Sequence, residues 1–306
     1  MCRHASQAPP HSYFFSRTTR DLHMLVNLII QAEEIPTQDL KSLHALSHAT
    51  AIEKIDLVPH QAFRLTHANP NTRENVRRYC ETAHLDFAFI ENGKKLSDFG
   101  LIAMDMDSTL ITIECIDEIA DYTGKKTEVA AITASAMRGE IDWPQSLRQR
   151  VALLKGLDET VLQRVYDERL KLSPGAEKLI AAAKSNHLKL LLVSGGFTFF
   201  TKRLKARLKI DVAHSNTLEV IGGKLTGNVT GPLCDADAKA RHLRETAATL
   251  QLSRAQCIVI GDGANDLKMM AEAGLSVAYH AKTVVQSQAN VAINQLGLDA
   301  VLGFFG

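Results

Sequence analysis

The stretch Leu101-Ile102-Ala103-Met104-Asp105-Met106-Asp107-Ser108-Thr109-Leu110 places an apolar strand directly before two aspartates. Carboxylates at positions i and i+2 of an extended chain point the same way, and like charges held that close repel each other. A hard divalent metal ion is the simplest relief of that repulsion. The pattern Asp-x-Asp also occurs in sugar-nucleotide transferases and in ordinary surface loops, so its surroundings decide its meaning.

A second apolar strand, Cys257–Asp262, ends in a similar way, because Gly261-Asp262-Gly263-Ala264-Asn265-Asp266 follows it. In open α/β sheets, ligands bind in the crevice at the carboxyl ends of the strands. Both strand ends would then face one crevice. We expect four carboxylates to form an oxygen-rich cation site there, namely those of Asp105, Asp107, Asp262 and Asp266.

A third strand ends in Ser194-Gly195-Gly196-Phe197, just before a new helix. A hydroxyl group and glycine N–H groups at such a position can hold a phosphoryl oxygen. Lys239, near the start of a later helix, can supply a positive charge to the same anion. A glycine loop of this kind is weak evidence by itself. A single lysine is also weak evidence, because it is usually a solvated surface residue.

Strands and helices alternate from Leu101 onward, which predicts an α/β fold with a parallel sheet covered on both faces. Residues 115–173 interrupt this alternation with helices alone, directly after the end of the first strand. The position predicts a helical cap over the ligand site. The expected strands are Leu101–Asp105, Leu188–Ser194, Cys257–Asp262, Leu275–Tyr279 and Asn290–Ile293, with a hairpin over Asn216–Thr230.

The N-terminal part of the chain has a different character, because no glycine precedes Gly93. Its periodicity predicts a β-α-β-β-α-β order, which is the ferredoxin-like α+β arrangement. Residues 23–95 therefore resemble the ACT domain family, although Ala32-Glu33-Glu34-Ile35-Pro36 replaces the glycine that this family often carries in its first strand-helix loop. We expect a dimerising or structural role, and amino-acid binding is the alternative.

Composition excludes several other classes of protein. The 306 residues carry a net charge of +1, which offers no global attraction to nucleic acid or to an anionic membrane. The five cysteines form no Cys-x-x-Cys pair, and no apolar run reaches the about 20 residues of a membrane span. A cytoplasmic protein is expected. Residues 1–22 read as a disordered leader, a transit peptide being the alternative, and Met24 is an alternative start to Met1.

Taken together, four motifs in this order resemble those of the haloacid dehalogenase (HAD) superfamily of phosphatases, over about residues 97–306. The motifs are Asp105-x-Asp107-Ser108-Thr109, Ser194-Gly195-Gly196, Lys239 and Gly261-Asp262-Gly263-Ala264-Asn265-Asp266. Glu114 and Ile116-Asp117-Glu118 make the sequence most similar to the phosphoserine phosphatase family, in its bacterial form with an N-terminal ACT-like domain. The resemblance implies a Rossmann-like HAD core at 96–306 with a helical cap at about 115–173.

The resemblance also implies a mechanism. Asp105 would attack phosphorus and form an aspartyl-phosphate, and Asp107 would act first as acid and then as base. Mg²⁺ would be held by the Asp105 and Asp262 side chains and by the backbone carbonyl of Asp107. Phosphate oxygens would be bound by Ser194, Gly195, Lys239 and Asn265, with Asp266 supporting the metal site or Lys239.

Two further residues would choose the substrate. Glu114 would receive the substrate ammonium, and Arg150 would hold its carboxylate, with Arg148 as the rival arginine. Met137 and Trp143 match apolar cap positions, where the family more often has phenylalanine in place of the tryptophan. Simple helix packing is the alternative for Trp143.

The implied reaction is Mg²⁺-dependent hydrolysis of O-phospho-L-serine, the last step of serine biosynthesis. Another small phosphomonoester, such as phosphothreonine, phosphohomoserine or a sugar phosphate, is the nearest alternative substrate. A second alternative is a regulatory protein whose N-terminal domain binds an amino acid and whose phosphatase fold has no activity. The presence of every catalytic acid argues against this alternative. An Asp-x-Asp glycosyltransferase leaves Lys239 unexplained. Besides the small-molecule substrate, a second copy of the chain in a homodimer is the one partner expected.

Overall fold

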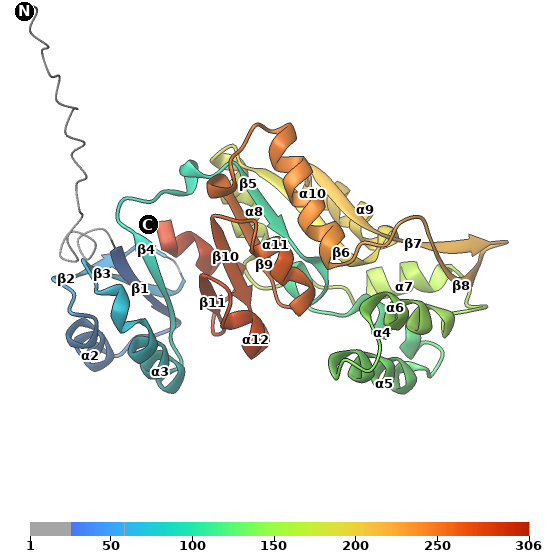
Figure 1. The fold of residues 1–306 in the computed structure, drawn as a ribbon, viewed down its shortest axis with the longest axis horizontal. Helices are drawn as coiled ribbons and strands as arrows, with labels where there is room; N and C mark the ends of the chain where they lie inside the picture. Colours follow the sequence, from blue (N-terminus) through green and yellow to red (C-terminus); the bar gives the residue numbers. More distant parts are fainter. Residues whose placement is uncertain (1–25, 58, 306) are drawn as a thin grey trace, which may run out of the picture.

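The computed structural model describes residues 26–57 and 59–305, so the expected leader and Met24 lie outside the described residues. Within these ranges the strands form one continuous sheet in the order β2-β3-β1-β4-β11-β10-β9-β5-β6-β7-β8. The N-terminal strands lie at one end of the molecule, and the helical insert and a long hairpin lie at the other end (Figure 1).

The centre of the sheet is parallel, as the alternation of strands and helices predicts. The carboxyl ends of its strands therefore share one edge. Its members are β5 (Leu101–Met104), β6 (Lys189–Phe197), β7 (Val212–Ile221), β9 (Cys257–Gly261), β10 (Leu275–Tyr279) and β11 (Val291–Ile293).

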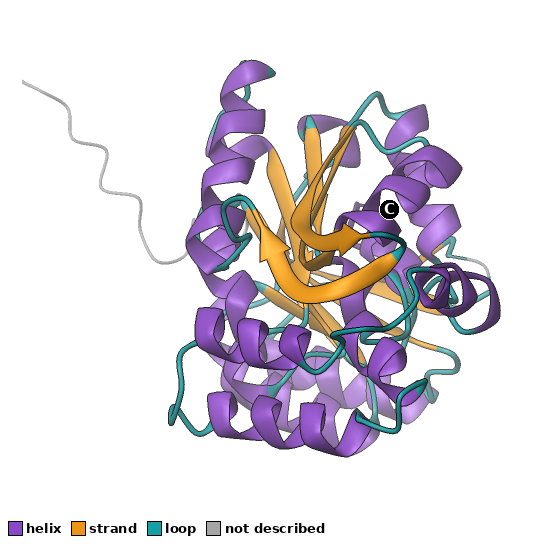
Figure 2. Ribbon diagram, turned by 90° about the vertical axis from the view of Figure 1, so that its right-hand side faces the viewer, coloured by secondary structure: helices purple, strands orange, loops and turns teal. Residues whose placement is uncertain are grey.

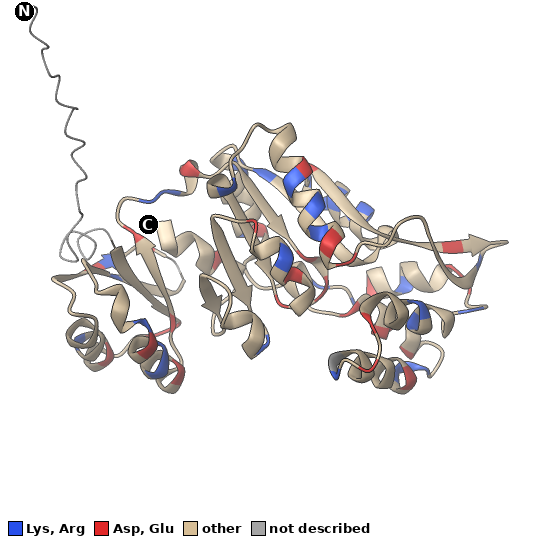
Figure 3. Ribbon diagram, viewed as in Figure 1, with Lys and Arg blue, Asp and Glu red and all other residues tan. Residues whose placement is uncertain are grey.

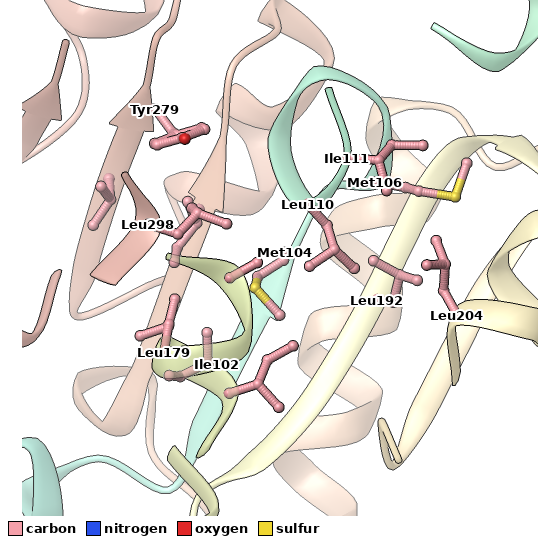
Figure 4. Packing of buried hydrophobic residues seen from close by; sticks show 14 of the residues in the cluster. Ile102, Met104, Met106, Leu110, Ile111, Leu179, Leu192, Leu204, Tyr279 and Leu298 are labelled. Carbon is pink, nitrogen blue, oxygen red and sulfur yellow. The ribbon is translucent and has the colours of Figure 1, made fainter. Parts of the chain in front are cut away.

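Helices cover both faces of this central sheet (Figure 2). On one face, Ile102 and Met104 of β5 pack in a cluster with α8 and α9 (Figure 4), and on the other, Leu101 and Ala103 pack with α10 and α11. Alternate side chains of a strand point to opposite faces, so an uninterrupted apolar strand requires both layers. The flanking helices are α8 (Ala176–Ser185), α9 (Thr198–Leu208), α10 (Ala236–Thr249), α11 (Leu267–Met270) and α12 (Thr283–Gln286).

The insert between β5 and β6 is helical, as expected. Its two connections to the core lie side by side, because Thr112 N–H donates to the Lys171 carbonyl at 3.0 Å and Ser173 N–H donates to the Leu110 carbonyl at 3.0 Å. The insert therefore enters and leaves the core at one place. Its helices are α4 (Cys115–Asp121), α5 (Lys126–Met137), α6 (Trp143–Ala152) and α7 (Thr160–Glu168).

The hairpin differs from the sequence prediction at its first strand. β7 begins at Val212 and pairs in parallel with β6, and only its second half pairs with β8 (Lys224–Thr230) as an antiparallel hairpin. β8 is also tied to the insert, since Leu225 exchanges backbone hydrogen bonds of 2.8 Å with Gly156 and Leu157. The hairpin and the insert therefore form one unit beside the edge where the strands end.

The N-terminal part has the element order predicted for it, and its four strands pair in an antiparallel manner. Leu40, Leu43 and Val76 of its helices cover one face of these strands. The other face, including Ile90, joins the main core cluster beside the C-terminal turn Leu298–Phe305. The elements are β1 (Val26–Ala32), α2 (Thr37–Ser47), β2 (Ala51–Ile55), β3 (Gln61–Thr66), α3 (Arg73–Ala83) and β4 (Asp86–Glu91).

Candidate active site

The Asp-x-Asp segment forms a sharp turn at the carboxyl end of β5. Ser108 adopts the left-handed conformation with φ of 55°, which costs a non-glycine residue free energy and is found mainly where geometry matters. The turn is held by side chains: Asp105 accepts a 2.7 Å hydrogen bond from Met106 N–H, and Asp107 accepts one of 3.2 Å from Cys115 N–H. Both carboxylates therefore have fixed positions.

A buried cluster of charges surrounds Asp105. The Lys239 ammonium lies 2.8 Å from Asp105 Oδ2 and 2.7 Å from Asp266 Oδ1, and the lysine is fully buried. Burial alone would lower the pKa of Lys239, but the two carboxylates outweigh it and hold the pKa above its ordinary value. Burial and the charge of Asp266 raise the pKa of Asp105, against the effect of Lys239. Lys239 is therefore a permanently charged group in the site.

A third carboxylate completes this cluster. Asp262 follows β9 and accepts a 2.8 Å hydrogen bond from the buried hydroxyl of Thr109. Oxygens of Asp105, Asp262 and Asp266 lie within 4.8 Å of one another. One lysine cannot balance three carboxylates, and hard carboxylate oxygens suit Mg²⁺, so the residues fit a divalent cation. The side chain of Asp107 does not belong to this triad. Asp266 does, in addition to its ion pair with Lys239.

The Ser194-Gly195-Gly196 segment leaves the sheet at the same edge. The register between β6 and β7 shifts between Val193 and Phe197, and Ser194 Oγ accepts a 2.8 Å hydrogen bond from Gly196 N–H. Neither glycine leaves room for a side chain. A Cβ atom on Gly196 would lie 2.5 Å from Asp107 Oδ2, and one on Gly195 would lie 2.9 Å from the Trp143 ring. The glycine backbone thus lies against both the Asp-x-Asp turn and the helical insert.

The structure separates the two candidate arginines. Glu114, Asp117 and Asp107 are close enough to Arg150 to oppose the lowering of its pKa by burial, whereas Arg148 is exposed. Glu114 accepts a 2.8 Å hydrogen bond from Ser108, and burial, followed by the charge of Asp107, raises the pKa of Glu114 to about 7. Arg150 of α6 and Glu114, just before α4, therefore lie within electrostatic range of each other and of Asp107.

The remaining predicted positions are described in part. Asn265 is half-buried. Its Oδ1 lies so close to Gly263 that a Cβ atom added to this glycine would be only 2.1 Å from it. Met137 ends α5, and its side chain lies outside the part of the chain that the structure describes.

The sequence analysis assigned no role to two residues of the site. Thr109 donates a hydrogen bond to Asp262, and Asn216 donates one to the Gly195 carbonyl. Asn216 stands in a β-rich segment with no motif around it, so nothing local marks it.

Comparison with known proteins agrees with this geometry. A family model described as haloacid dehalogenase-like hydrolase matches residues 102–271. The chain belongs to this family of hydrolases. A second model, for a domain of unknown function (DUF4072), matches residues 28–76 of the same hydrolase.

Relatives of this HAD hydrolase carry a more specific name. It is 60% identical over 213 residues to a phosphoserine phosphatase of Polaromonas sp. (strain JS666), which covers 68% of this chain and 90% of the relative. A phosphoserine phosphatase of Haemophilus influenzae is 47% identical, over 74% of this chain and 71% of its own length. The structure of a probable phosphoserine phosphatase from Vibrio cholerae has a TM-score of 0.79 at 37% identity and covers 91% of this chain and 86% of that chain.

Charged residues of both signs occur in the helical insert and on α10 of this HAD hydrolase, in keeping with the net charge of +1 (Figure 3). Within the described residues, no helix is both long enough and apolar enough to cross a bilayer.

Proposed function

We propose that this HAD hydrolase is a phosphoserine phosphatase, which cleaves O-phospho-L-serine to L-serine and phosphate in the last step of serine biosynthesis. The observation that carries the proposal is that Glu114 and Arg150 lie within electrostatic range of each other and of Asp107, in the site that holds the buried Asp105-Lys239 pair. A substrate with an ammonium, a carboxylate and a phosphate needs an anion, an arginine and a cationic phosphate site in that arrangement.

Asp105 is the nucleophile in this proposal. Its carboxylate oxygen forms a bond to phosphorus while the bond from phosphorus to the serine oxygen breaks. Asp107 donates its proton to the departing serine oxygen, and burial raises the pKa of Asp107 to about 6, which favours the protonated form that this step needs. Asp107 then takes a proton from the water that attacks the aspartyl-phosphate. Phosphate leaves, and the Asp105 carboxylate is restored.

Asp105, Asp262 and the backbone carbonyl of Asp107 would hold Mg²⁺, and the short distances among the acidic triad support this assignment, with Asp266 beside them. When bound, the ion supplies charge neutralisation between the nucleophile and the incoming phosphate. Lys239, Ser194, Gly195 and Asn265 would bind the other phosphate oxygens. Because Gly196 N–H bonds Ser194 Oγ, the serine hydroxyl keeps its own proton for the substrate.

The test is phosphate release from a panel of phosphomonoesters by the full chain. We expect turnover of phosphoserine, weaker turnover of phosphothreonine and phosphohomoserine, and loss of activity after chelation that added Mg²⁺ restores. A sugar phosphate as the best substrate would refute the proposed substrate, although not the phosphatase chemistry.

A second measurement tests the nucleophile. Asp105→Asn should abolish turnover, and acid quenching of the native enzyme with labelled phosphoserine should trap a labelled protein adduct. Asp237→Asn, which changes an exposed acid of α10 paired with Lys268, is the matched control and should keep full activity. Substantial turnover by Asp105→Asn would contradict the assignment.

We further propose the domain boundaries and the nature of the N-terminal part. Residues 23–95 would form an ACT-like, ferredoxin-fold domain, supported by the observed strand order β2-β3-β1-β4 with two helices on one face. Residues 96–306 would form the HAD core with its cap at about 115–173. The N-terminal domain would serve a structural or dimerising role in a cytoplasmic enzyme, where the buried Cys80, Cys115, Cys234 and Cys257 stay as free thiols.

A further inference from the structure

The phosphate-binding loop is held in place by a residue outside all four motifs. Asn216 of β7 is only 1% exposed, and both ends of its amide are used. Its Nδ2 donates to the Gly195 carbonyl at 2.7 Å, and its Oδ1 accepts from Cys234 N–H at 2.8 Å. One side chain therefore joins the loop after β6 to the segment that leads into α10.

The strand register explains why the loop needs this partner. Val193 pairs with His214 and Phe197 with Asn216, so three residues of β6 stand opposite a single residue of β7. Such a bulge removes backbone groups from the ladder and turns them toward one side of the sheet. A carbonyl that loses its ladder partner in a buried place must find another donor, and the Asn216 amide provides one for Gly195.

Both ends of the same peptide unit are then fixed. The Gly195 carbonyl is held by Asn216, and the N–H on the other side of that peptide, on Gly196, is held by Ser194 Oγ. A planar peptide with both ends bonded cannot rotate. This fixed peptide keeps the Ser194 hydroxyl and the loop backbone close to Asp107.

The second bond of Asn216 reaches the charged half of the phosphate site. Cys234 precedes Asp235, whose side chain caps α10 by accepting a 2.9 Å hydrogen bond from Ala238 N–H. Lys239 is the next residue of that first turn. Asn216 therefore connects the Ser194-Gly195-Gly196 loop to the segment that leads to Lys239.

We propose that Asn216 is a positioning residue that sets the phosphate-binding loop against Lys239, so that the site recognises phosphate independently of the amino-acid end of the substrate. This inference rests on the proposed function for the identity of the site. Asn216 need not contact the substrate, and its effect should be confined to the phosphate end, because Glu114 and Arg150 belong to other elements.

The test uses the Mg²⁺-loaded full chain and two probes, inorganic phosphate and L-serine, with binding measured by calorimetry. Asn216→Asp keeps the shape but places a carboxylate oxygen against the Gly195 carbonyl. We expect phosphate binding to weaken by about tenfold or more, since the loop must turn its carbonyl away. L-serine binding should stay within about twofold of native, and kcat for phosphoserine should fall.

A matched control separates positioning from simple loss of stability. Asn27 of β1 is 4% exposed and also bonds at both amide ends, with Asn92 and with His67 N–H, but lies in the N-terminal sheet. Asn27→Asp should lower the unfolding temperature in a similar way and leave phosphate binding unchanged. If Asn216→Asp does not fold, Asn216→Ala removes the donor without adding a charge and takes its place.

Two results would overturn the proposal: native phosphate binding in a folded Asn216 variant, or an equal loss of phosphate and L-serine binding. The proposed function fails separately. If the native protein binds phosphate but does not hydrolyse phosphoserine, the substrate assignment is wrong and the phosphate measurements on Asn216 still decide its role.

Discussion

At the scale of single residues, burial and charge separate side chains that look equivalent in the sequence. Arg148 and Arg150 stand two positions apart on α6, but Arg150 is half-buried near Glu114, Asp117 and Asp107, whereas Arg148 is exposed. Helical residues two positions apart point about 200° away from each other, so one can face the site while the other faces solvent.

The arginine pair gives a matched prediction. Arg150→Lys should raise KM for phosphoserine by about tenfold with a smaller change in kcat, because lysine cannot present a two-pronged donor to a carboxylate. Arg148→Lys should leave both constants unchanged. Steady-state kinetics checks this, and the opposite ranking would move the carboxylate-binding role to Arg148.

Glu114 predicts the pH dependence of substrate capture. Its pKa is raised to about 7, first by burial and then by Asp107, so it becomes protonated and neutral as the pH falls below about 7. A neutral carboxyl group binds an ammonium poorly, and kcat/KM for phosphoserine should therefore fall as the pH decreases through that value.

The control for this profile is a substrate without an ammonium, such as phenyl phosphate, measured over the same pH range. Its kcat/KM should lack the decline that Glu114 causes, and Glu114→Gln should remove that decline from the phosphoserine profile. An identical acid limb for both substrates, kept in Glu114→Gln, would assign the titration to another group.

At the scale of elements, the site is built where strands end and helices begin. β5, β6 and β9 each end at the same edge, and α10 presents Lys239 from its first turn. The helical insert and the β7-β8 hairpin are joined by backbone hydrogen bonds and lie beside this edge (Figure 1). A side chain that fixes the start of α10 should therefore influence chemistry at Asp105.

Asp235, which caps α10, tests this dependence. Asp235→Ala removes the acceptor for Ala238 N–H and should lower the free energy of unfolding by about 1 kcal/mol, with a fall in kcat because the turn that carries Lys239 loosens. Denaturant unfolding and kinetics measure the two effects. Asp235→Ser, which restores an acceptor, should recover both, and native kcat in the alanine variant would argue against the coupling.

At the scale of the whole molecule, the antiparallel N-terminal strands join the parallel strands of the same sheet at one edge and share the main core cluster with them. β4 and β11 share a single pair of residues, Phe87 and Ala292. Beside it the buried Asp86 accepts hydrogen bonds of 2.7–3.2 Å from the N–H groups of Asn294, Gln295 and Leu296. The carboxylate therefore links the N-terminal strands to the segment that follows β11.

Removing the Asp86 carboxylate should lower the stability of the whole protein. Asp86→Ala leaves three backbone donors without their acceptor and should lower the free energy of unfolding by about 3 kcal/mol. Scanning calorimetry should show a lower transition temperature for the protein. Asp98→Ala, which removes an exposed acid with one backbone bond to Lys95, should change the transition far less. Equal effects of the two changes would show that Asp86 contributes no more than a surface acid.

Sequence patterns alone predict the α/β class of the core and the motif residues that gather at the candidate site. Apolar strands, the helical insert and the strand-end motifs depend on periodicity and on backbone chemistry within a few residues, and the structure places Asp105, Asp107, Ser194, Lys239 and Asp262 at one edge of the sheet. The hairpin shows the limit of such patterns, because the first half of β7 joins the parallel sheet and only neighbouring strands decide that.

Which groups from distant parts of the chain bond to each other depends on the packing of the folded molecule. The bonds from Thr109 to Asp262 and from Asn216 to the Gly195 carbonyl span 153 and 21 residues, and the link from Asp86 to Leu296 spans 210. Each of these bonds depends on strand register and on burial, which are set only when the layers pack. Neither produces a repeating pattern in the sequence. The same packing half-buries Arg150 beside acidic neighbours and leaves Arg148 exposed.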